Sequence, residues 1–521
     1  MKKARAARAS LKLEQKVARS KNIQEEVTLE TKRVINLQPI FVPPTPGPGE
    51  KHGFDLLSIG WLRRILLWRH TRKVFQISLL IAAIAVIFDG LTGDQYAPKN
   101  LATTSTWIDY RFVLVLSILL VGNLFCMSCP FVLVSHSLQK KIGLNRAWPT
   151  WLKGKWIASG LLLVILYAYE QFSLWNNPFL TAVVTLAYFG GAIVVDGLFK
   201  GNAFCKYVCP LGMFNQVYAM VSPTEVKSKS FAYCKSCTTK ECVKGNEHSG
   251  KNGVNHQEGC QTQLYIGTKQ SNLDCTYALS CVKACPYSNV ALETRPFGRE
   301  LWVNIKKREF SLGVAVMVVT FGALTNAGGM VNGFTDVEAA IARALGLNEF
   351  WAYTLIFLLL TTVIPAGVAL LASQLSLRMS RSHDYDWRGI FKRFAPGLLP
   401  LSLGIWTAHY FFHFVVGGGG GWPTLQNLFK RIGFPILGEP NWATGALLPY
   451  GFILPIQLLF IYGGFLLTSV SMYQISRQMF VRKRKTAQRA MIAWVGLALL
   501  LALVAMYIMF QPMQARGTFS T

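Results

Sequence analysis

Residues 178–199, PFLTAVVTLAYFGGAIVVDGLF, run almost directly into residues 201–210, GNAFCKYVCP. As a helix rising about 1.5 Å per residue, the first stretch is long enough to cross the ~30 Å hydrocarbon core of a bilayer. The second stretch carries two cysteines and a proline, which ends the helix. The pattern predicts a membrane-spanning helix that presents thiols at one of its ends.

A second copy of this pattern lies 79 residues earlier, where residues 122–130 read GNLFCMSCP. Both copies follow the pattern G-N-x-F-C-(x2 or x3)-C-P. Each copy comes at the end of the second helix of a predicted two-helix pair. We therefore expect a parallel repeat that gathers four thiols at one membrane boundary, where backbone N–H groups freed by proline favour thiolates. Four thiols in this arrangement have three possible functions: they hold an iron-sulfur cluster, they hold another metal, or they exchange electrons as dithiols. The alternative is that they are buried cysteines with no function beyond packing. The four are Cys126, Cys129, Cys205 and Cys209.

Similar apolar runs recur along the 521-residue chain, in which 52% of residues are hydrophobic and 15% charged. This composition excludes an ordinary soluble protein and a disordered one. We expect a mainly α, polytopic helical membrane protein with about nine transmembrane helices and an inserted ferredoxin-like iron-sulfur segment. The expected spans are residues 74–92, 110–128, 155–173, 178–199, 310–332, 350–374, 396–416, 447–473 and 490–510.

The positions of the basic residues predict the orientation. With the N-terminus inside and one crossing per run, 47 of the 53 Lys and Arg residues fall on inner segments, as the positive-inside rule requires. We expect a multi-pass protein of the inner (cytoplasmic) membrane, with the N-terminus and the iron-sulfur segment cytoplasmic, the C-terminus outside and the first span an uncleaved signal anchor. Attraction to the anionic leaflet of the lipid bilayer explains the net charge of +28, so we expect no nucleic acid partner.

The chain divides into five predicted regions. The first two are a flexible basic cytoplasmic arm with a Pro/Gly spacer and an interfacial amphipathic helix. A four-helix membrane repeat, a cytoplasmic ferredoxin-like domain and a five-helix membrane domain of unassigned role follow. In order, they cover residues 1–53, 54–73, 74–222, 223–308 and 309–521.

The segment between the fourth and fifth spans holds the other seven cysteines. A ferredoxin site reads C-x2-C-x2-C-x3-C-P, and the stretch from Cys275 to Pro286 fits it at three of four cysteine positions, with Ala278 at the missing one. The first half of the segment has wider spacings. The seven candidate cofactor-binding cysteines are Cys234, Cys237, Cys242, Cys260, Cys275, Cys281 and Cys285.

The preferred division of these cysteines is into two iron-sulfur clusters. A 4Fe-4S cluster takes Cys234, Cys237, Cys242 and Cys285, and a second 4Fe-4S or 3Fe-4S cluster takes Cys260, Cys275 and Cys281 with an open or non-cysteine fourth position. Exchange of Cys242 and Cys260 between the two is an alternative. Structural zinc and disulfides are further alternatives, less favoured because the x3-C-P ending is typical of ferredoxins and the cytoplasm is reducing.

Residues 74–295 resemble the membrane-bound polyferredoxins of the NapH, NosR and FixG/CcoG type. The shared features are paired helices ending in C-x3-C-P, a ferredoxin segment after them, and the closely matching stretch CKYVCPLG at residues 205–212. The first pair is spaced x2, and position 278 lacks its cysteine. The resemblance implies electron transfer between the quinone/quinol pool and a redox partner, either other redox subunits or a soluble electron carrier.

Two histidines in the run 396–416 are the candidate catalytic residues. His409 and His413 are four apart, so they share a helix face in the outer half of the membrane. Ionisable residues at such depth are costly and usually functional. Proton handling at a quinone site, haem b, another metal and a purely structural role all remain open. Haem is less favoured because one helix face cannot supply both axial ligands.

The sequence thus predicts a quinol dehydrogenase-like electron-transfer subunit of an oxidoreductase. One alternative is a metal-handling or assembly factor that reduces copper for oxidase maturation. The FixG/CcoG resemblance motivates this alternative, together with Met506, Met509 and Met513, because thioethers bind Cu(I). A redox-sensing regulator acting through the basic arm is a third hypothesis.

Overall fold

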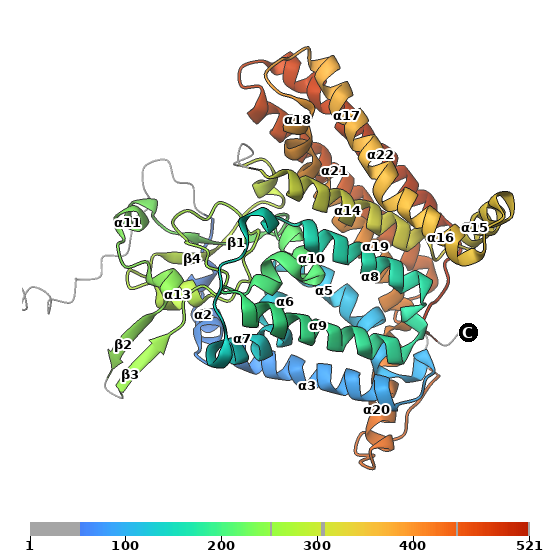
Figure 1. The fold of residues 1–521 in the computed structure, drawn as a ribbon, viewed down its shortest axis with the longest axis horizontal. Coiled ribbons are helices and arrows are strands. Elements are labelled where there is room, and N and C mark those ends of the chain that lie inside the picture. Colours follow the sequence, from blue (N-terminus) through green and yellow to red (C-terminus); the bar gives the residue numbers. More distant parts are fainter. Residues whose placement is uncertain (1–52, 251–252, 304–307, 444–445, 519–521) are drawn as a thin grey trace, which may run out of the picture.

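A computed structural model describes residues 53–250, 253–303, 308–443 and 446–518, with only the backbone at 247–250 and 253–256. Nearly all regular structure in these residues is helical, with two small two-stranded sheets (Figure 1). The predicted polytopic helical fold is confirmed. The predicted basic arm lies outside the described residues, apart from Gly53.

Within the described residues, seven helical stretches are long and apolar enough to cross a membrane. Two are the single helices α3 (Thr71–Thr92) and α9 (Pro178–Leu198), and a third is α14 (Phe310–Gly328). Glu349–Ser380 contains α16 (Glu349–Leu358) and α17 (Ile364–Ser380), and Trp387–Arg431 contains α18 (Trp387–Phe394), α19 (Leu399–Gly417) and α20 (Gly421–Arg431). The last two are Tyr450–Met479, which contains α21 (Ile453–Met479), and α22 (Arg484–Phe510).

The expected count of about nine spans needs two corrections. The run 110–128 belongs to a broken pair, Leu101–Leu120 and Leu124–Ile142, that bends by 108° and forms at most an eighth span. The pair contains α4 (Leu101–Thr103), α5 (Tyr110–Leu120), α6 (Leu124–Met127) and α7 (Pro130–Ile142). The run 155–173 forms α8 (Trp156–Gln171), whose 16 residues rise only about 24 Å, less than the hydrocarbon thickness.

The two cysteine motifs fold alike. In each, a helix ends two or three residues before a glycine with positive φ, at +113° for Gly122 and +80° for Gly201, and a helical turn then carries the first cysteine. The second cysteine precedes a proline that begins the next helix, Pro130 in α7 and Pro210 in α10 (Pro210–Tyr218). We call the end of the bundle that carries these motifs the thiol end and the opposite end the far end.

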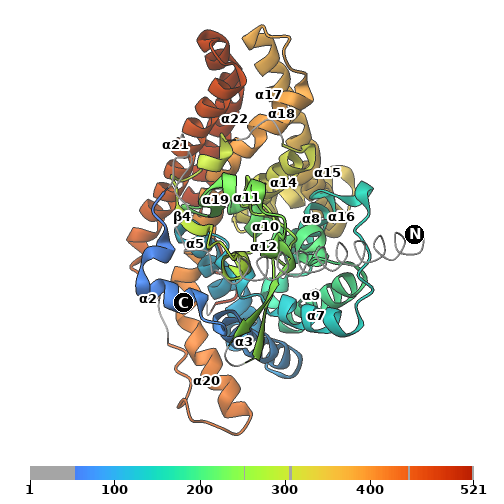
Figure 2. The same ribbon diagram turned by 90° about the vertical axis from the view of Figure 1, so that its left-hand side faces the viewer.

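The ferredoxin-like segment covers the thiol end (Figures 1 and 2). Strand β1 (Thr224–Ser228) pairs antiparallel with β4 (Val290–Thr294), so that Thr224 lies opposite Thr294. Between them in the chain come the hairpin of β2 (Asn246–Gly250) and β3 (Gly253–Gln257) and three short helices. These helices are α11 (Phe231–Ser236), α12 (Glu241–Lys244) and α13 (Ser280–Ala284).

Helix α2 (Gly60–Leu67) precedes the first span and buries none of its residues. Its Trp61 is 65% exposed beside the exposed Arg63 and Arg64. Exposed tryptophan next to exposed arginines suits the lipid–water interface, and an interfacial position of residues 54–73 stays a prediction.

The C-terminal half forms the second part of the bundle. Helices α14 and α19 lie at its centre with most of their residues buried, whereas α17, α21 and α22 are more peripheral and lean away from α3 and α9 (Figure 1). Helix α15 (Asn332–Leu345) lies across the far end. Burial of α19 on all sides is why its histidines and aromatic residues reach the interior rather than lipid.

Candidate functional site

The two motifs bring their four thiols together inside the thiol end. We call these cysteines the membrane thiol group: Cys126, Cys129, Cys205 and Cys209, each 3–7% exposed. The thiols of Cys126 and Cys205 are hydrogen-bonded to each other, and the other two lie close enough to interact with them electrostatically. One buried site therefore takes two sulfurs from each copy of the repeat.

Backbone N–H groups point at the second cysteine of each motif. In the first turn of α10 the Gly212 N–H donates to Cys209 Sγ at 3.1 Å. The first turn of α7 follows Cys129 in the same way, with the N–H groups of Phe131 and Val132 near Cys129 Sγ. Helix N-termini carry partial positive charge, which stabilises a thiolate. Sulfurs supplied with such donors fit an iron-sulfur cluster, whose ligands are thiolates.

The asparagine of each G-N pair ties the ferredoxin-like segment to the membrane helices. Asn123 Nδ2 donates to the carbonyl of Cys275 at 2.9 Å, and Asn202 Nδ2 donates to Gln261 Oε1 at 3.2 Å. A Cβ at Gly122 would lie 2.9 Å from the Tyr277 hydroxyl, so the close approach requires glycine. The sequence showed both pairs but gave these residues no role.

Four cysteines of the ferredoxin-like segment surround one small cavity. This first ferredoxin site consists of Cys234, Cys237, Cys242 and Cys285, the set preferred from the sequence for one cluster. Asn289 Nδ2 donates to Cys234 Sγ at 3.3 Å, and the Ile266 N–H donates to Cys242 Sγ. Burial, helped by nearby thiols, raises the pKa of Cys242 to about 11, so iron must displace its proton on binding.

The other three cysteines form a second ferredoxin site. Cys281 interacts electrostatically with Cys260 and Cys275, and burial raises the pKa of both Cys275 and Cys281 while the Lys269 ammonium opposes that rise. Because Cys242 lines the cavity of the first site and Cys260 groups with Cys275, the geometry favours the preferred division over the exchange.

Arg72 of α3 lies between the membrane thiol group and the second ferredoxin site. Its Nε donates to the Met127 carbonyl at 3.3 Å and its Nη2 donates to Gln261 Oε1. Its charge interacts with thiols of both sites, Cys129 and Cys205 on one side and Cys260 on the other. The Cys260 N–H donates to the Cys242 carbonyl at 2.9 Å, so the second ferredoxin site also adjoins the first, and the three sites form a series. Arg72, which the sequence marked only as an inner basic residue, supplies positive charge between the membrane thiol group and the second site.

Within the described residues, no three Cys, His, Asp or Glu side chains converge tightly enough to hold a single metal ion. All eleven cysteines are free.

An apolar cavity of about 290 Å³ lies beside the membrane thiol group, between α3, α5, α8, α9, α10 and α19. Phe125 and Pro130 of the first motif and Phe131, which follows it, form part of its wall. Tyr110 also lines it, interacts electrostatically with the thiols, and has a buried hydroxyl without a hydrogen-bond partner among the described residues. An unsatisfied buried hydroxyl in an apolar cavity points to a bound polar group.

Arg111 is the one cationic side chain in the wall of this cavity. It donates to the Trp107 carbonyl at 2.6 Å and to the Tyr169 hydroxyl at 2.9 Å, and its guanidinium lies over the ring of Tyr410 at 4.7 Å. Aromatic rings and neutral oxygens surround it, and no ion pair among the described residues includes it. The charge is thus available to an acceptor in the cavity. From the sequence, Arg111 counted only among the few outer basic residues.

The two candidate histidines are buried on α19, one turn apart. Their ring centroids are 4.9 Å apart, and His413 Nε2 lies 3.1 Å from Met330 Sδ. Neither ring nitrogen of His409 has a partner in the described part of the chain. The histidines do not line the apolar cavity, but Trp406 and Tyr410 of the same helix do.

The methionine stripe of α22 packs into the bundle. Met509 is buried and its sulfur accepts from Gln457 Nε2 at 3.2 Å, while Met506 and Met513 pack against the hydrophobic core. Packing alone accounts for these three side chains.

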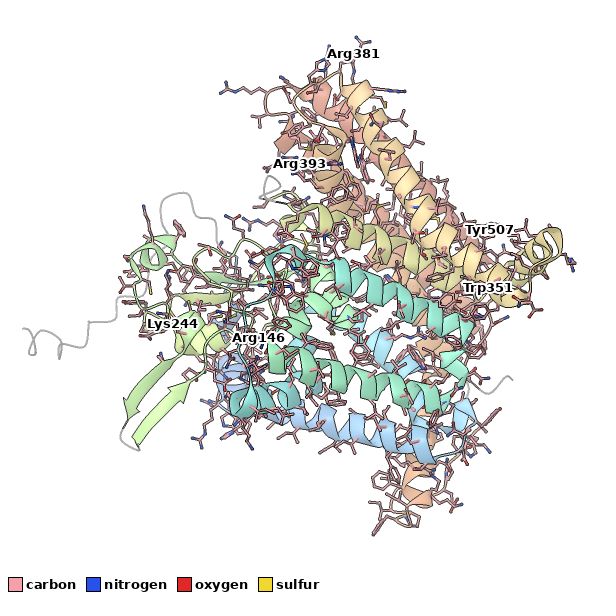
Figure 3. All side chains as sticks on the ribbon, in the orientation of Figure 1. Arg146, Lys244, Trp351, Arg381, Arg393 and Tyr507 are labelled. Atoms are coloured by element: carbon pink, nitrogen blue, oxygen red, sulfur yellow. The ribbon has the colours of Figure 1, made fainter. Side chains whose placement is uncertain are left out.

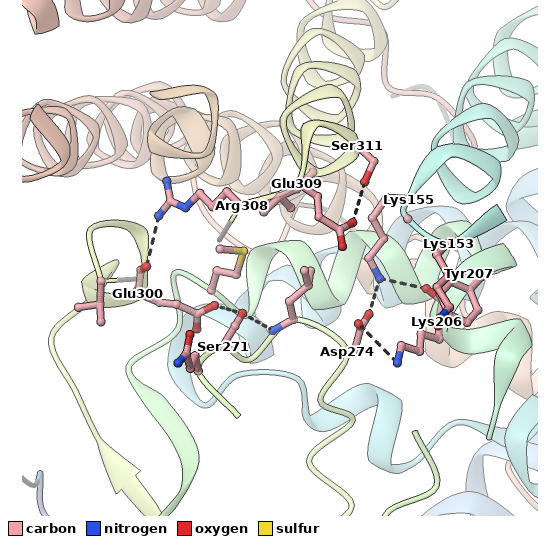
Figure 4. Close-up of a pocket in the computed structure, with 16 residues that line it drawn as sticks. Lys153, Lys155, Lys206, Tyr207, Ser271, Asp274, Glu300, Arg308, Glu309 and Ser311 are labelled. Carbon is pink, nitrogen blue, oxygen red and sulfur yellow. Dashed lines mark hydrogen bonds and ion pairs between the residues drawn. The ribbon is translucent and has the colours of Figure 1, made fainter. Parts of the chain in front are cut away.

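A polar cavity of about 300 Å³ lies where the ferredoxin-like segment meets α8 and α14 (Figure 4). Lys155 Nζ donates to Asp274 Oδ1 at 2.5 Å and to Gln216 Oε1 at 2.8 Å. Lys206, which follows Cys205, lies 4.0 Å from the same carboxylate, and Asp274 precedes Cys275. This ion pair fixes the second ferredoxin site against the membrane thiol group.

Replacing Asp274 with asparagine should loosen that junction. The Lys155 side chain is 5% and that of Asp274 19% exposed, and breaking a largely buried ion pair costs about 3 kcal/mol. Faster proteolysis of residues 223–303 and a lower unfolding temperature in detergent are expected. The control is Asp384→Asn, whose partner Lys483 is 58% exposed; it should change neither. Equal effects of the two substitutions would contradict the assignment.

Introducing the missing cysteine should complete the second ferredoxin site. Ala278 lies half-buried in the loop between Cys275 and Cys281, at the second position of the ferredoxin pattern. Ala278→Cys is expected to raise the iron content by about one atom per chain if three irons are held there, with a changed EPR spectrum; Ala278→Ser is the control. An unchanged spectrum would show that position 278 does not face the cluster.

Comparison with known protein families matches residues 111–158 and 181–226 to a model described as a 4Fe-4S binding domain. Each range contains one copy of the cysteine repeat, and together they cover well under half of the chain. No curated protein matches the chain, and no solved structure matches it. The observations support an iron-sulfur protein with several membrane-spanning helices.

Proposed function

We propose that this protein relays electrons between the quinone/quinol pool and a redox partner. The main support is that an apolar cavity directly adjoins the membrane thiol group. The wall of this cavity contains the Arg111 guanidinium and the Tyr110 hydroxyl, which has no partner among the described residues. Iron-sulfur clusters bound by the three groups of thiols would supply one-electron carriers there. The resemblance to quinol dehydrogenase components supports the same proposal.

The residues of the cavity suit the head group of a quinone. Helix α3 forms one wall while exposing Ile77, Ile81 and Ile84 on its other face, so the cavity lies close to the surface that would face the bilayer. Arg111 is placed to donate to a quinone or quinol oxygen, and the Tyr110 hydroxyl is free to hydrogen-bond an oxygen nearer the thiols. Both interactions hold the head group beside the membrane thiol group and favour the deprotonated oxygen that forms on oxidation.

Oxidation of one quinol releases two electrons and two protons. His409 and His413 lie on the same helix as Trp406 and Tyr410 of the cavity wall, and both ring nitrogens of His409 lack a partner among the described residues, so the histidines remain candidates for accepting a proton. In the proposed orientation the thiol end, with its basic segments, faces the cytoplasm and electrons leave the quinol toward that side.

Anaerobic purification followed by addition of a soluble quinol analogue tests the proposal. Bleaching of the cluster absorbance and an EPR signal of reduced clusters are expected, with dithionite giving the maximum signal. Iron-loaded protein that dithionite reduces but no quinol analogue reduces would refute quinol oxidation. The reverse direction is then tested with dithionite-reduced protein and a quinone, whose failure to reoxidise the clusters would remove the proposal altogether.

Metal handling is a second candidate, favoured by the contact between His413 and the Met330 sulfur. An imidazole and a thioether together suit Cu(I). Equilibrium dialysis against Cu(I) is the test, and Met330→Leu should weaken binding at least tenfold if this pair holds the metal. Unchanged binding in that variant would remove the candidate.

A further inference from the structure

The first ferredoxin site lies in the part of the molecule farthest from the spans. Helices α11 and α12, which carry Cys234 and Cys242, lie at the outer tip of the ferredoxin-like segment, and Figure 2 looks directly onto this tip. Cys237 and Cys285 are half-buried, whereas the cysteines of the membrane thiol group are buried. The cysteines of the second ferredoxin site are half-buried too, but Asn123 and Lys155 hold that site against the membrane helices. Of the three sites, this one is where an electron can pass to or from another protein.

The surface around Cys237 is basic. Lys235, Lys240 and Lys244 are all exposed, and no ion pair among the described side chains includes any of them. The nearest acidic residue along the chain, Glu241, is half-buried and accepts from Asn246 Nδ2 at 3.0 Å. Lys240 Nζ lies 5.5 Å from the centroid of the Tyr265 ring, which leaves its charge in place, so none of the three lysine charges is neutralised by a described carboxylate.

Attraction to lipid does not explain these lysines. The positive-inside rule concerns charges close to the ends of spans, and at physiological salt a charge acts over about 8 Å. Lys244 lies at the tip of the ferredoxin-like segment, away from Arg381 and Arg393 at the ends of the membrane helices (Figure 3). Charge at this distance from the bilayer suits a soluble molecule.

Two aromatic side chains complete the surface. Tyr233 and Tyr287 line the cavity of the first ferredoxin site, are 40% and 41% exposed, and have ring centroids 6.4 Å apart. Exposed aromatics surrounded by positive charge are typical of protein interfaces formed through electrostatic steering. The half-buried Cys237 is thus surrounded by exposed aromatic rings and lysines, as is typical of interfaces that form transiently for electron transfer.

We infer that this surface binds an acidic one-electron carrier protein, which exchanges electrons with the first ferredoxin site. The docking surface consists of Tyr233, Lys235, Cys237, Lys240, Lys244 and Tyr287. The inference rests on the proposed function and names its partner. In the balanced reaction two reduced carriers give up one electron each and one quinone takes up both electrons with two protons; the reverse consumes one quinol and two oxidised carriers.

Binding of a plant-type [2Fe-2S] ferredoxin, which is acidic, tests the docking surface, and the basic carrier cytochrome c is the control ligand. Micromolar binding of the ferredoxin to immobilised full-length protein is expected, weakening at least tenfold between 20 and about 200 mM salt, as interactions between exposed charges do. Cytochrome c should not bind. Equal binding of both carriers, or no dependence on salt, would overturn the inference.

Two triple variants locate the surface. K235Q/K240Q/K244Q should weaken ferredoxin binding at least tenfold and flatten its salt dependence, with unchanged iron content. R484Q/K485Q/R489Q, which neutralises three exposed charges on α22, should leave binding as in the wild type. Equal loss in both would overturn the docking surface. Reduction by quinol without a carrier is measured separately in each variant, so failure of docking is distinguishable from failure of the proposed function.

Discussion

Replacing Cys205 with serine should cut quinol-driven reduction of the ferredoxin sites at least 100-fold, while dithionite still reduces them. Cys205 is buried, and its thiol is hydrogen-bonded to that of Cys126 in the other copy of the repeat. Serine keeps the size of the side chain but is a poor iron ligand, so the membrane thiol group loses one of its four thiolates. Electrons from the apolar cavity then lack their first acceptor.

Rapid mixing with a quinol analogue, followed by EPR, measures this loss, and iron analysis should show fewer atoms per chain. Ser128→Ala is the matched control, because Ser128 lies between the two cysteines of the first motif and is also buried. It should behave as the wild type. Wild-type rates in Cys205→Ser would show that the membrane thiol group is not on the electron route.

The sequence predicted the fold where its signal is periodic and strong. All nine apolar runs are helical in the structure, and the repeated motif anticipated that four distant thiols meet. Seven of the nine predicted spans are long apolar helices in the described residues, and the other two differ in length or direction because hydropathy does not reveal a bend. The turn at Gly122 breaks one run by 108°, and α8 ends at Gln171 before reaching full membrane length.

The missed residues act through contacts between segments distant in the chain. Asn123 reaches Cys275 across 152 positions, and Arg72 reaches Gln261 across 189. In the sequence, Arg111 stands out as a single arginine in an apolar run. Only the structure shows that it lies in the wall of a cavity and not at a solvated end of a span. Cysteine spacing can limit the possible ligand groups, but which sulfurs face each other depends on packing.

Substitution of Arg111 tests whether the apolar cavity binds a quinone. Replacing it with methionine should lower the rate of quinol oxidation about 10- to 100-fold, because a hydrogen bond to a charged group contributes about 1.5–3 kcal/mol and each 1.36 kcal/mol in a barrier is tenfold in rate. Arg111→Lys should recover part of the rate, since the ammonium keeps the charge but not the geometry of the fork. Reduction by dithionite should stay unchanged in both variants.

The thermal stability of the Arg111→Met variant distinguishes a quinone-binding role of Arg111 from a structural role. A buried guanidinium without a carboxylate partner is costly to bury, so an apolar side chain of similar length should leave the protein equally or more stable. We expect Arg111→Met to unfold at or above the wild-type temperature in detergent while losing quinol oxidation. Thermal unfolding and stopped-flow reduction of the same preparations measure the two effects. Lower stability together with unchanged quinol kinetics would mean that Arg111 holds Tyr169 and Tyr410 in place and that the cavity binds no quinone at this charge.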